Sequence, residues 1–209
     1  MAKALLAKDA LPFEEEATNA GMCVSALRTF EEWNHHPQAQ TLLGRLPIEL
    51  VKIGDAPVRR RMEKTKLLPL DGIRVLELTR VIAGPVAGRT LATFGADVLR
   101  ITSPNLPSIP VADIDTSRGK RAAQVDLESD KGVDTLQQLV DECDVFLQSY
   151  RPGSLERRGF DAASLAKRRP GIVVANLRGY GWDGPWAEKR AVCILLFLTD
   201  VDADGENVV

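Results

Sequence analysis

Basic side chains recur in the segments that follow the apolar runs of this sequence, and they suit the binding of phosphate. Arginine stays charged, and its planar guanidinium donates paired hydrogen bonds to phosphate oxygens. In an open parallel sheet, ligands bind where loops leave the carboxyl ends of the strands. If the apolar runs are such strands, the loops form an anion- or nucleotide-binding rim. Its candidate cations are Arg80, Arg118, Lys120, Arg121, Arg151 and Arg178.

The elements that would position these cations alternate between strand and helix patterns from residue 70 onward. Pro85 suits the first turn of the first helix and Gly95 suits its end. Short strands joined by helical crossovers form a mostly parallel sheet with helices on both faces. We therefore predict an α/β fold with a Rossmann-like sheet layer that is incomplete at the C-terminus. The strands are expected at residues 73–78, 97–102, 125–127, 144–149 and 172–177.

Changes in pattern predict four segments along the chain. The first is a small, mainly helical annex with one short strand between Pro47 and Gly54, bounded by proline and glycine. A basic linker, an α/β domain and a divergent tail follow it. The boundaries are 1–58 for the annex, 59–66 for the linker, 67–190 for the α/β domain and 191–209 for the tail.

Composition argues against several classes of protein. The 209 residues are 44% apolar and 27% charged with a net charge of −2, so neither a nucleic-acid nor a membrane partner is expected. The longest apolar run, 191–198, has eight residues, whereas a membrane span needs roughly 20. Three widely spaced cysteines argue against a disulfide framework. We expect a soluble intracellular protein, cytoplasmic rather than organellar.

Motifs for other chemistries are incomplete. Gly84 and Gly88 are spaced as GxxxG, which is not the dinucleotide fingerprint, and no P-loop occurs. The pair His35–His36 has no acidic or cysteine ligand at suitable spacing, so a surface turn is expected there and not a metal site. The acidic residues of 200–205 repeat only the first half of a calcium loop. We expect no metal and identify no catalytic residue.

Two tryptophans lie in a glycine-rich loop, residues 179–186. Such a loop is poor core material because its backbone is free to adopt many conformations. Trp182 and Trp186 therefore face a ligand or an interface, or they form a local packing plug, and the sequence leaves both alternatives open.

Several segments taken together resemble the class III CoA-transferase family (CaiB/BaiF type), which includes the α-methylacyl-CoA racemases. Each segment is short, but their order and separation over about 120 residues make the set specific. The matching segments are Pro69–Leu78, Ala83–Pro85, Phe94–Val98, Arg118–Arg121, Val125–Leu127, Tyr150–Gly153, Gly159–Phe160 and Gly179–Pro185.

The resemblance implies coenzyme A bound on a Rossmann-like layer, and a homodimer or an association with a full-length relative. It also implies that acyl-CoA or CoA is the partner molecule. Many members of the family have an arginine where this chain has Ser103, which weakens the inferred pocket. Carried over by position, the CoA contacts are Arg121, Val125, Asp126, Leu127, Glu128, Ser149, Tyr150, Arg151 and Arg157.

The resemblance also implies the reaction, which is transfer of CoA between carboxylic acids through an aspartyl intermediate. Relatives place that aspartate after the point that corresponds to residue 209, so we expect this chain to be truncated and inactive by itself. A racemase-type member and a non-catalytic CoA-binding or dimer-partner module are the alternatives. Ala20–Trp33 and His36–Ala39 resemble a late segment of the family, as expected for a truncated fungal-type tandem member.

Overall fold

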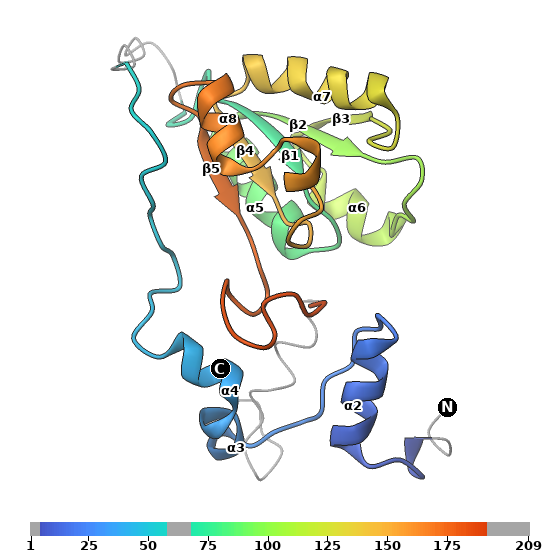
Figure 1. Ribbon diagram of the computed structural model, residues 1–209. Helices are drawn as coiled ribbons and strands as arrows, with labels where there is room; N and C mark the ends of the chain where they lie inside the picture. The colour runs from blue at the N-terminus through green and yellow to red at the C-terminus, as the bar shows by residue number, and fades with distance from the viewer. Residues whose placement is uncertain (1–4, 58–67, 192–209) are drawn as a thin grey trace. The chain divides into compact units, whose positions relative to one another are not determined.

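The computed structural model describes residues 5–57 and 68–191 (Figure 1). They belong to two compact units. One comprises the residues up to Glu49 together with those from Arg178 onward, and the other is Leu50–Leu177. The expected basic linker 59–66 lies outside the described residues, as do the tail from residue 192 and its acidic pattern 200–205.

The unit Leu50–Leu177 contains a parallel sheet of five strands in the order β3-β2-β1-β4-β5 (Figure 1). Leu76 of the central strand pairs with Leu99 on one side and with Phe146 on the other. This confirms the predicted α/β class and its mostly parallel sheet. The strands are β1 (Arg74–Leu78), β2 (Asp97–Thr102), β3 (Arg121–Gln124), β4 (Val145–Gln148) and β5 (Val173–Asn176).

Helices cover both faces of this sheet, with α7 and α8 on one face and α5 on the other (Figure 1). Successive residues of β1 point to opposite faces, so Leu76 joins the core beneath α7 and α8, while Val75 packs with Leu91 of α5. The helical elements are α5 (Ala83–Thr93), α6 (Pro110–Thr116), α7 (Asp130–Glu142), the 3₁₀ turn η1 (Glu156–Arg158) and α8 (Ala162–Arg168).

Local signals in the sequence set several of these boundaries. Ser129 caps α7, since its hydroxyl accepts a hydrogen bond from the Gly132 amide at 3.1 Å. Gly95 follows α5 with a φ of 98°, and Gly159 ends η1 with a φ of 81°. Both are left-handed conformations that glycine adopts without steric cost. The predicted helix end at Gly95 is thus confirmed.

The structure differs from the predicted elements in three places. Strand β3 is Arg121–Gln124, before the predicted 125–127, because Leu99–Thr102 of β2 pairs with 121–124. The helix α6 was not predicted, since its seven residues give too little periodicity. No strand forms at 47–54 among the described residues: Leu50 is 97% exposed, and this apolar run has no neighbouring strand to pair with.

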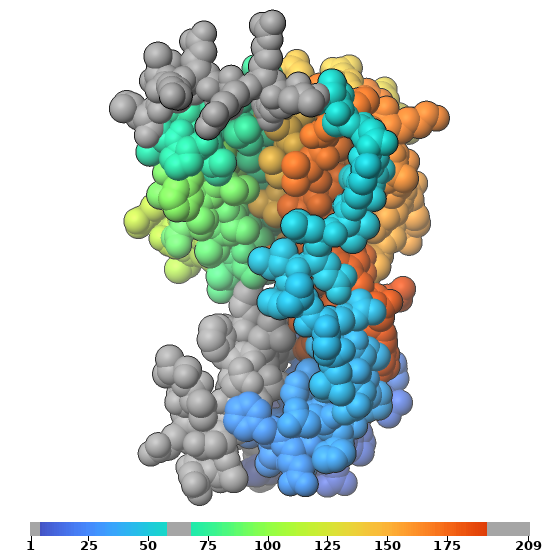
Figure 2. Space-filling model, turned by 90° about the vertical axis from the view of Figure 1, so that its left-hand side faces the viewer, coloured from blue at the N-terminus to red at the C-terminus, as the bar shows by residue number. Residues whose placement is uncertain are grey.

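Residues 50–57 instead run extended over the surface of their unit (Figure 2). A Cβ atom added at Gly54 would meet the Ala166 side chain of α8 at 3.9 Å, so the segment passes beside that helix.

No helix in the described parts of the chain is both long enough and apolar enough to span a membrane.

The other unit joins three helices to the loop that follows β5. The helices are α2 (Ala10–Asn19), α3 (Phe30–His35) and α4 (Pro37–Leu42). Thr29 and Glu32 form a capping box at the start of α3. The buried Gln38 amide donates to the backbone carbonyls of Tyr180 and Asp183 at 2.7 and 2.8 Å, which fixes the loop against α4.

Candidate functional site

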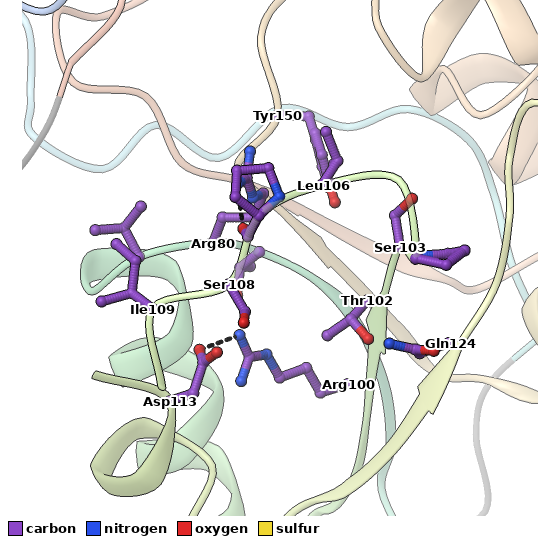
Figure 3. A pocket seen from close by; sticks show the side chains of 14 residues that line it. Arg80, Arg100, Thr102, Ser103, Leu106, Ser108, Ile109, Asp113, Gln124 and Tyr150 are labelled. Atoms are coloured by element: carbon purple, nitrogen blue, oxygen red, sulfur yellow. Dashed lines mark hydrogen bonds and ion pairs between the residues drawn. The ribbon is translucent and has the colours of Figure 1, made fainter. Parts of the chain in front are cut away.

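The strand order reverses direction at β1, because the chain proceeds from β1 to β2 and β3 on one side and then returns to β4 on the other. Ligands of open α/β sheets bind at such a switch point, outside the carboxyl ends of the strands. A cavity of about 410 Å³ lies there (Figure 3). Its polar lining comes from Thr79, Arg80, Arg100, Thr102, Ser103, Ser108, Asp113, Gln124 and Tyr150.

Arg100 of β2 is a buried cation in the wall of this cavity (Figure 3). Its guanidinium donates to an Asp113 carboxylate oxygen at 2.6 Å and to the Ser117 hydroxyl at 2.7 Å. Its Nε is also buried and has no hydrogen-bond partner among the described residues. Arg100 therefore ties α6 and the residues after it to β2, with its charge balanced by a carboxylate.

Arg80 follows β1 and is an exposed cation on the same cavity (Figure 3). One Nη2 hydrogen bond to the Pro107 carbonyl, at 2.7 Å, orients the side chain. It forms no ion pair with any carboxylate in the described ranges. Since a guanidinium has five N–H donors, most of those of Arg80 remain available to a ligand.

Tyr150 approaches the cavity from the loop after β4 (Figure 3). The Gln148 side chain fixes its backbone by accepting from the Tyr150 amide at 2.8 Å, and Gln148 itself donates to Asn176 of β5 at 2.6 Å. Burial raises the pKa of the Tyr150 phenol, against the opposing effect of the guanidinium groups of Arg80 and Arg100. The phenol is therefore a neutral hydrogen-bond donor near neutral pH.

The backbone after β1 is held in a tight conformation. Val81 has a φ of 69°, which is a strained value for a β-branched residue. Such outliers cluster at functional sites. Behind this turn, a Cβ at Gly84 would lie 2.6 Å from the Thr79 Cβ and 2.8 Å from the Ser149 hydroxyl. Glycine is needed there because the start of α5 packs directly against the ends of β1 and β4.

Lys120 was predicted to face the ligand rim, but the structure places it elsewhere. Its ammonium is fully buried 2.7 Å from one Glu77 oxygen and 2.9 Å from the other, and it donates to the Pro85 carbonyl at 2.7 Å. Burial lowers the pKa of Lys120, and Glu77 opposes this. Thr79 donates to the same carboxylate at 2.6 Å. The pair thus joins β1, the first turn of α5 and the start of β3 beneath the rim.

The second glycine of the GxxxG pair makes room for this ion pair. A Cβ at Gly88 would lie 1.8 Å from a Glu77 carboxylate oxygen. Gly84 and Gly88 therefore serve close packing of α5 on the sheet.

Arg121 and Arg118 also differ from the prediction that the loop cations share the carboxyl rim. Arg121 is the first residue of β3 and pairs with both oxygens of Asp97, the first residue of β2. Arg118 is exposed and lies 3.6 Å from Asp115 of α6. The loop 103–120 begins at the carboxyl end of β2 but ends at the amino end of β3, so its last residues lie away from the rim.

The remaining predicted contacts follow the carboxyl ends of β3 and β4. Arg158 donates to the Leu127 carbonyl at 2.9 Å and to the Ser154 carbonyl at 2.8 Å. Segment 125–128 is thereby linked to the turn around η1, which also contains Arg157. Arg151 and Arg157 are exposed and have no ion pair within the described residues.

The glycine-rich tryptophan loop belongs to the other unit, with Arg178. Trp186 contacts His36 with ring centroids 4.3 Å apart and Tyr180 at 5.0 Å, so it serves packing. Trp182 is 42% exposed, and the Arg178 guanidinium lies 3.8 Å from its ring centroid. His36 caps α4 by accepting from the Gln38 amide. No group of potential metal ligands occurs among the described residues.

Comparison with known proteins gives a family match over the sheet unit and the loop after it. The profile described as CoA-transferase family III matches residues 70–196. An acyl-CoA transferase of Gibberella moniliformis is 45% identical over 126 residues, which cover 58% of this chain and 22% of that protein. The probable fatty acyl-CoA transferase Rv3272 of Mycobacterium tuberculosis is 31% identical over 141 residues, covering 61% of this chain and 36% of the relative.

Solved structures agree with the sequence matches. The crystal structure of Rv3272 superposes with a TM-score of 0.58 at 28% identity, covering 68% of this chain and 44% of that one. A CaiB/BaiF family protein from Brucella suis gives a TM-score of 0.54 at 33% identity, covering 59% and 36%. This chain therefore spans less than half of the length of each of these relatives.

Proposed function

Because the chain belongs to CoA-transferase family III, we propose that its sheet unit binds coenzyme A or an acyl-CoA at the carboxyl ends of β1 to β4. The observation that carries this proposal is the cavity at the strand-order reversal, whose free cation, Arg80, stands beside the Tyr150 phenol. A phosphate-bearing ligand would receive charge-assisted hydrogen bonds from such groups.

The proposed ligand contacts combine this cavity with segments predicted from the resemblance. Backbone and side chains of 125–128 and 149–151, together with Arg157, would surround the nucleotide end of the carrier. Arg121 remains a prediction from sequence; its carboxylate partner Asp97 would compete with the ligand for its guanidinium.

The proposed reaction of the whole protein is CoA transfer between carboxylic acids, through an aspartyl intermediate. Forming a covalent intermediate divides one difficult acyl transfer into two easier steps. The resemblance places that aspartate outside the 209 residues, so the polypeptide 1–209 is expected to bind the carrier without transferring it. In this proposal the chain supplies the binding layer and positions the thioester.

Calorimetric titration with CoA tests the binding, and a radiolabelled CoA-exchange assay with the same polypeptide tests the chemistry. Binding without exchange is the expected result. Absence of CoA binding by a folded sample would refute the proposed function, and exchange would refute the expected inactivity.

We further propose that the chain associates with itself or with a longer relative, as the family resemblance implies. Apolar side chains on the outer face of α6 support this, since Val111 is 84% and Ile114 is 73% exposed. Light scattering after size exclusion measures the mass. A monodisperse monomer at all concentrations tested would contradict the association.

A further inference from the structure

The cavity at the strand-order reversal contains two arginines in different electrostatic surroundings. The charge of Arg100 is balanced by Asp113 at 2.6 Å, and its side chain is buried. Arg80 is exposed, is oriented by one backbone carbonyl and has no carboxylate partner within the described ranges. With Asp113 offsetting Arg100 and the Tyr150 phenol neutral, the cavity carries a net charge of about +1, and that charge belongs to Arg80.

We propose that Arg80 determines specificity for phosphate in this cavity, by pairing with a phosphate group at the adenosine end of coenzyme A. Arg100 is a positioning residue, which fixes α6 and Ser117 so that the loop 103–109 closes one side of the cavity. This inference rests on the proposed function and adds to it the residue that distinguishes the phosphorylated carrier from its fragments.

The lining of the cavity fits such a group. Hydroxyls of Ser103 and Ser108 stand beside the cations and can donate to phosphate oxygens, whereas the Thr102 hydroxyl donates to the Ala123 carbonyl. Leu106 and Ile109 supply apolar surface from the same loop, as a nucleoside next to the phosphate requires. Figure 3 shows Arg80, Ser103, Ser108 and Tyr150 around one hollow.

A single hydrogen bond to the loop 103–109 maintains the orientation of the Arg80 side chain. The Pro107 carbonyl accepts from Nη2 and leaves the other donors of the fork available. A lysine at this position would keep the charge but would lose the paired geometry. The Arg80→Lys variant is therefore expected to bind CoA with an affinity between those of the wild type and of Arg80→Gln.

Calorimetric titration of the full chain with CoA, dephospho-CoA and pantetheine tests the inference. Replacing Arg80 by Gln should weaken CoA binding about tenfold or more, since a hydrogen-bonded charge pair is lost, and should leave pantetheine binding unchanged. If the contact is the 3′-phosphate, the wild type prefers CoA to dephospho-CoA and the variant loses this preference. If it is the diphosphate, the variant binds both more weakly by a similar factor.

The matched control is Arg74→Gln, which removes an exposed arginine from the other end of the same strand. Control and variant should unfold at similar temperatures, and the control should bind CoA like the wild type. If Arg80→Gln binds CoA like the wild type, the role of Arg80 is refuted while CoA binding stands. If the folded wild type binds none of the three compounds, the proposed function and this inference both fail.

Discussion

The two ends of the parallel sheet both carry arginines, but the arginines differ in what surrounds them. At the amino ends, Arg74 lies 3.2 Å from Glu142, and Arg121 pairs with Asp97 at 2.6 Å. These charges are already neutralised within the chain. Because exposed pairs of this kind contribute only about 0–1 kcal/mol to stability, their main effect is to leave that end without a free anion site.

At the carboxyl ends, Arg80, Arg151 and Arg157 have no carboxylate partner in the part of the chain that the structure describes. All three are exposed. A count of basic residues therefore does not locate an anion site. What locates it is the set of cations that remains after the internal ion pairs have been assigned.

The largest effect is expected for Lys120, a cation whose charge is fully compensated by a buried carboxylate. Lys120→Met would leave Glu77 buried without a counter-charge, at a cost of about 3–5 kcal/mol in the free energy of unfolding. Replacing both residues, as Lys120→Met with Glu77→Leu, should recover much of this loss. Urea denaturation measures both, with the exposed Lys131→Met as control. Equal stability of Lys120→Met and wild type would contradict the buried pair.

Replacing single arginines at each end of the sheet by glutamine tests the comparison through CoA binding. Arg151→Gln and Arg157→Gln should each weaken CoA binding by about tenfold, the expected loss for one charge-assisted contact. Arg121→Gln should leave the dissociation constant unchanged, because Asp97 already occupies its guanidinium. A loss with Arg121→Gln as large as with Arg151→Gln would mean that the ligand reaches Arg121, as the sequence predicts.

Acid should destabilise the unit that contains helices α2 to α4, because it protonates the buried Glu14 carboxylate. Burial of Glu14 favours its neutral form, but hydrogen bonds from Arg28 and Lys189 outweigh it and lower the pKa below its ordinary value of 4.5. The carboxylate therefore stabilises the fold above about pH 4.5, and this contribution is lost as the pH falls through the lowered pKa. Thermal unfolding across this range should show a dependence that Glu14→Gln reduces; an unchanged dependence would contradict it.

The smallest expected effect is that of Asp97→Asn. Losing an exposed ion pair should cost less than about 1 kcal/mol in the free energy of unfolding. The same change frees Arg121, so it should make CoA affinity more sensitive to salt only if the ligand lies within reach of β3. CoA titrations at two salt concentrations measure this sensitivity. The matched control is Glu142→Gln, which frees Arg74 of β1 in the same way.

Sequence patterns sufficed for the class of fold and for four of the five strands to within about a residue at each end. They did not show that Arg118 and Arg121 lie away from the carboxyl rim, because the loop before β3 begins at that rim but ends at the opposite one, where Arg121 is the first residue of the strand. The charged Glu77 and Arg100 inside apolar strands were a usable signal. Their partners Lys120 and Asp113 come from a distant loop and a short helix, which periodicity cannot pair.

The unit of helices α2 to α4 is completed by residues from Arg178 onward, so the sheet unit is inserted between its two parts. During synthesis the helices leave the ribosome first, but Gln38 and Glu14 gain their partners Tyr180 and Lys189 only after more than a hundred further residues. The sheet unit can fold on its own contacts in the meantime. Helices α2 to α4, which are made before the sheet unit, therefore reach their final packing after it.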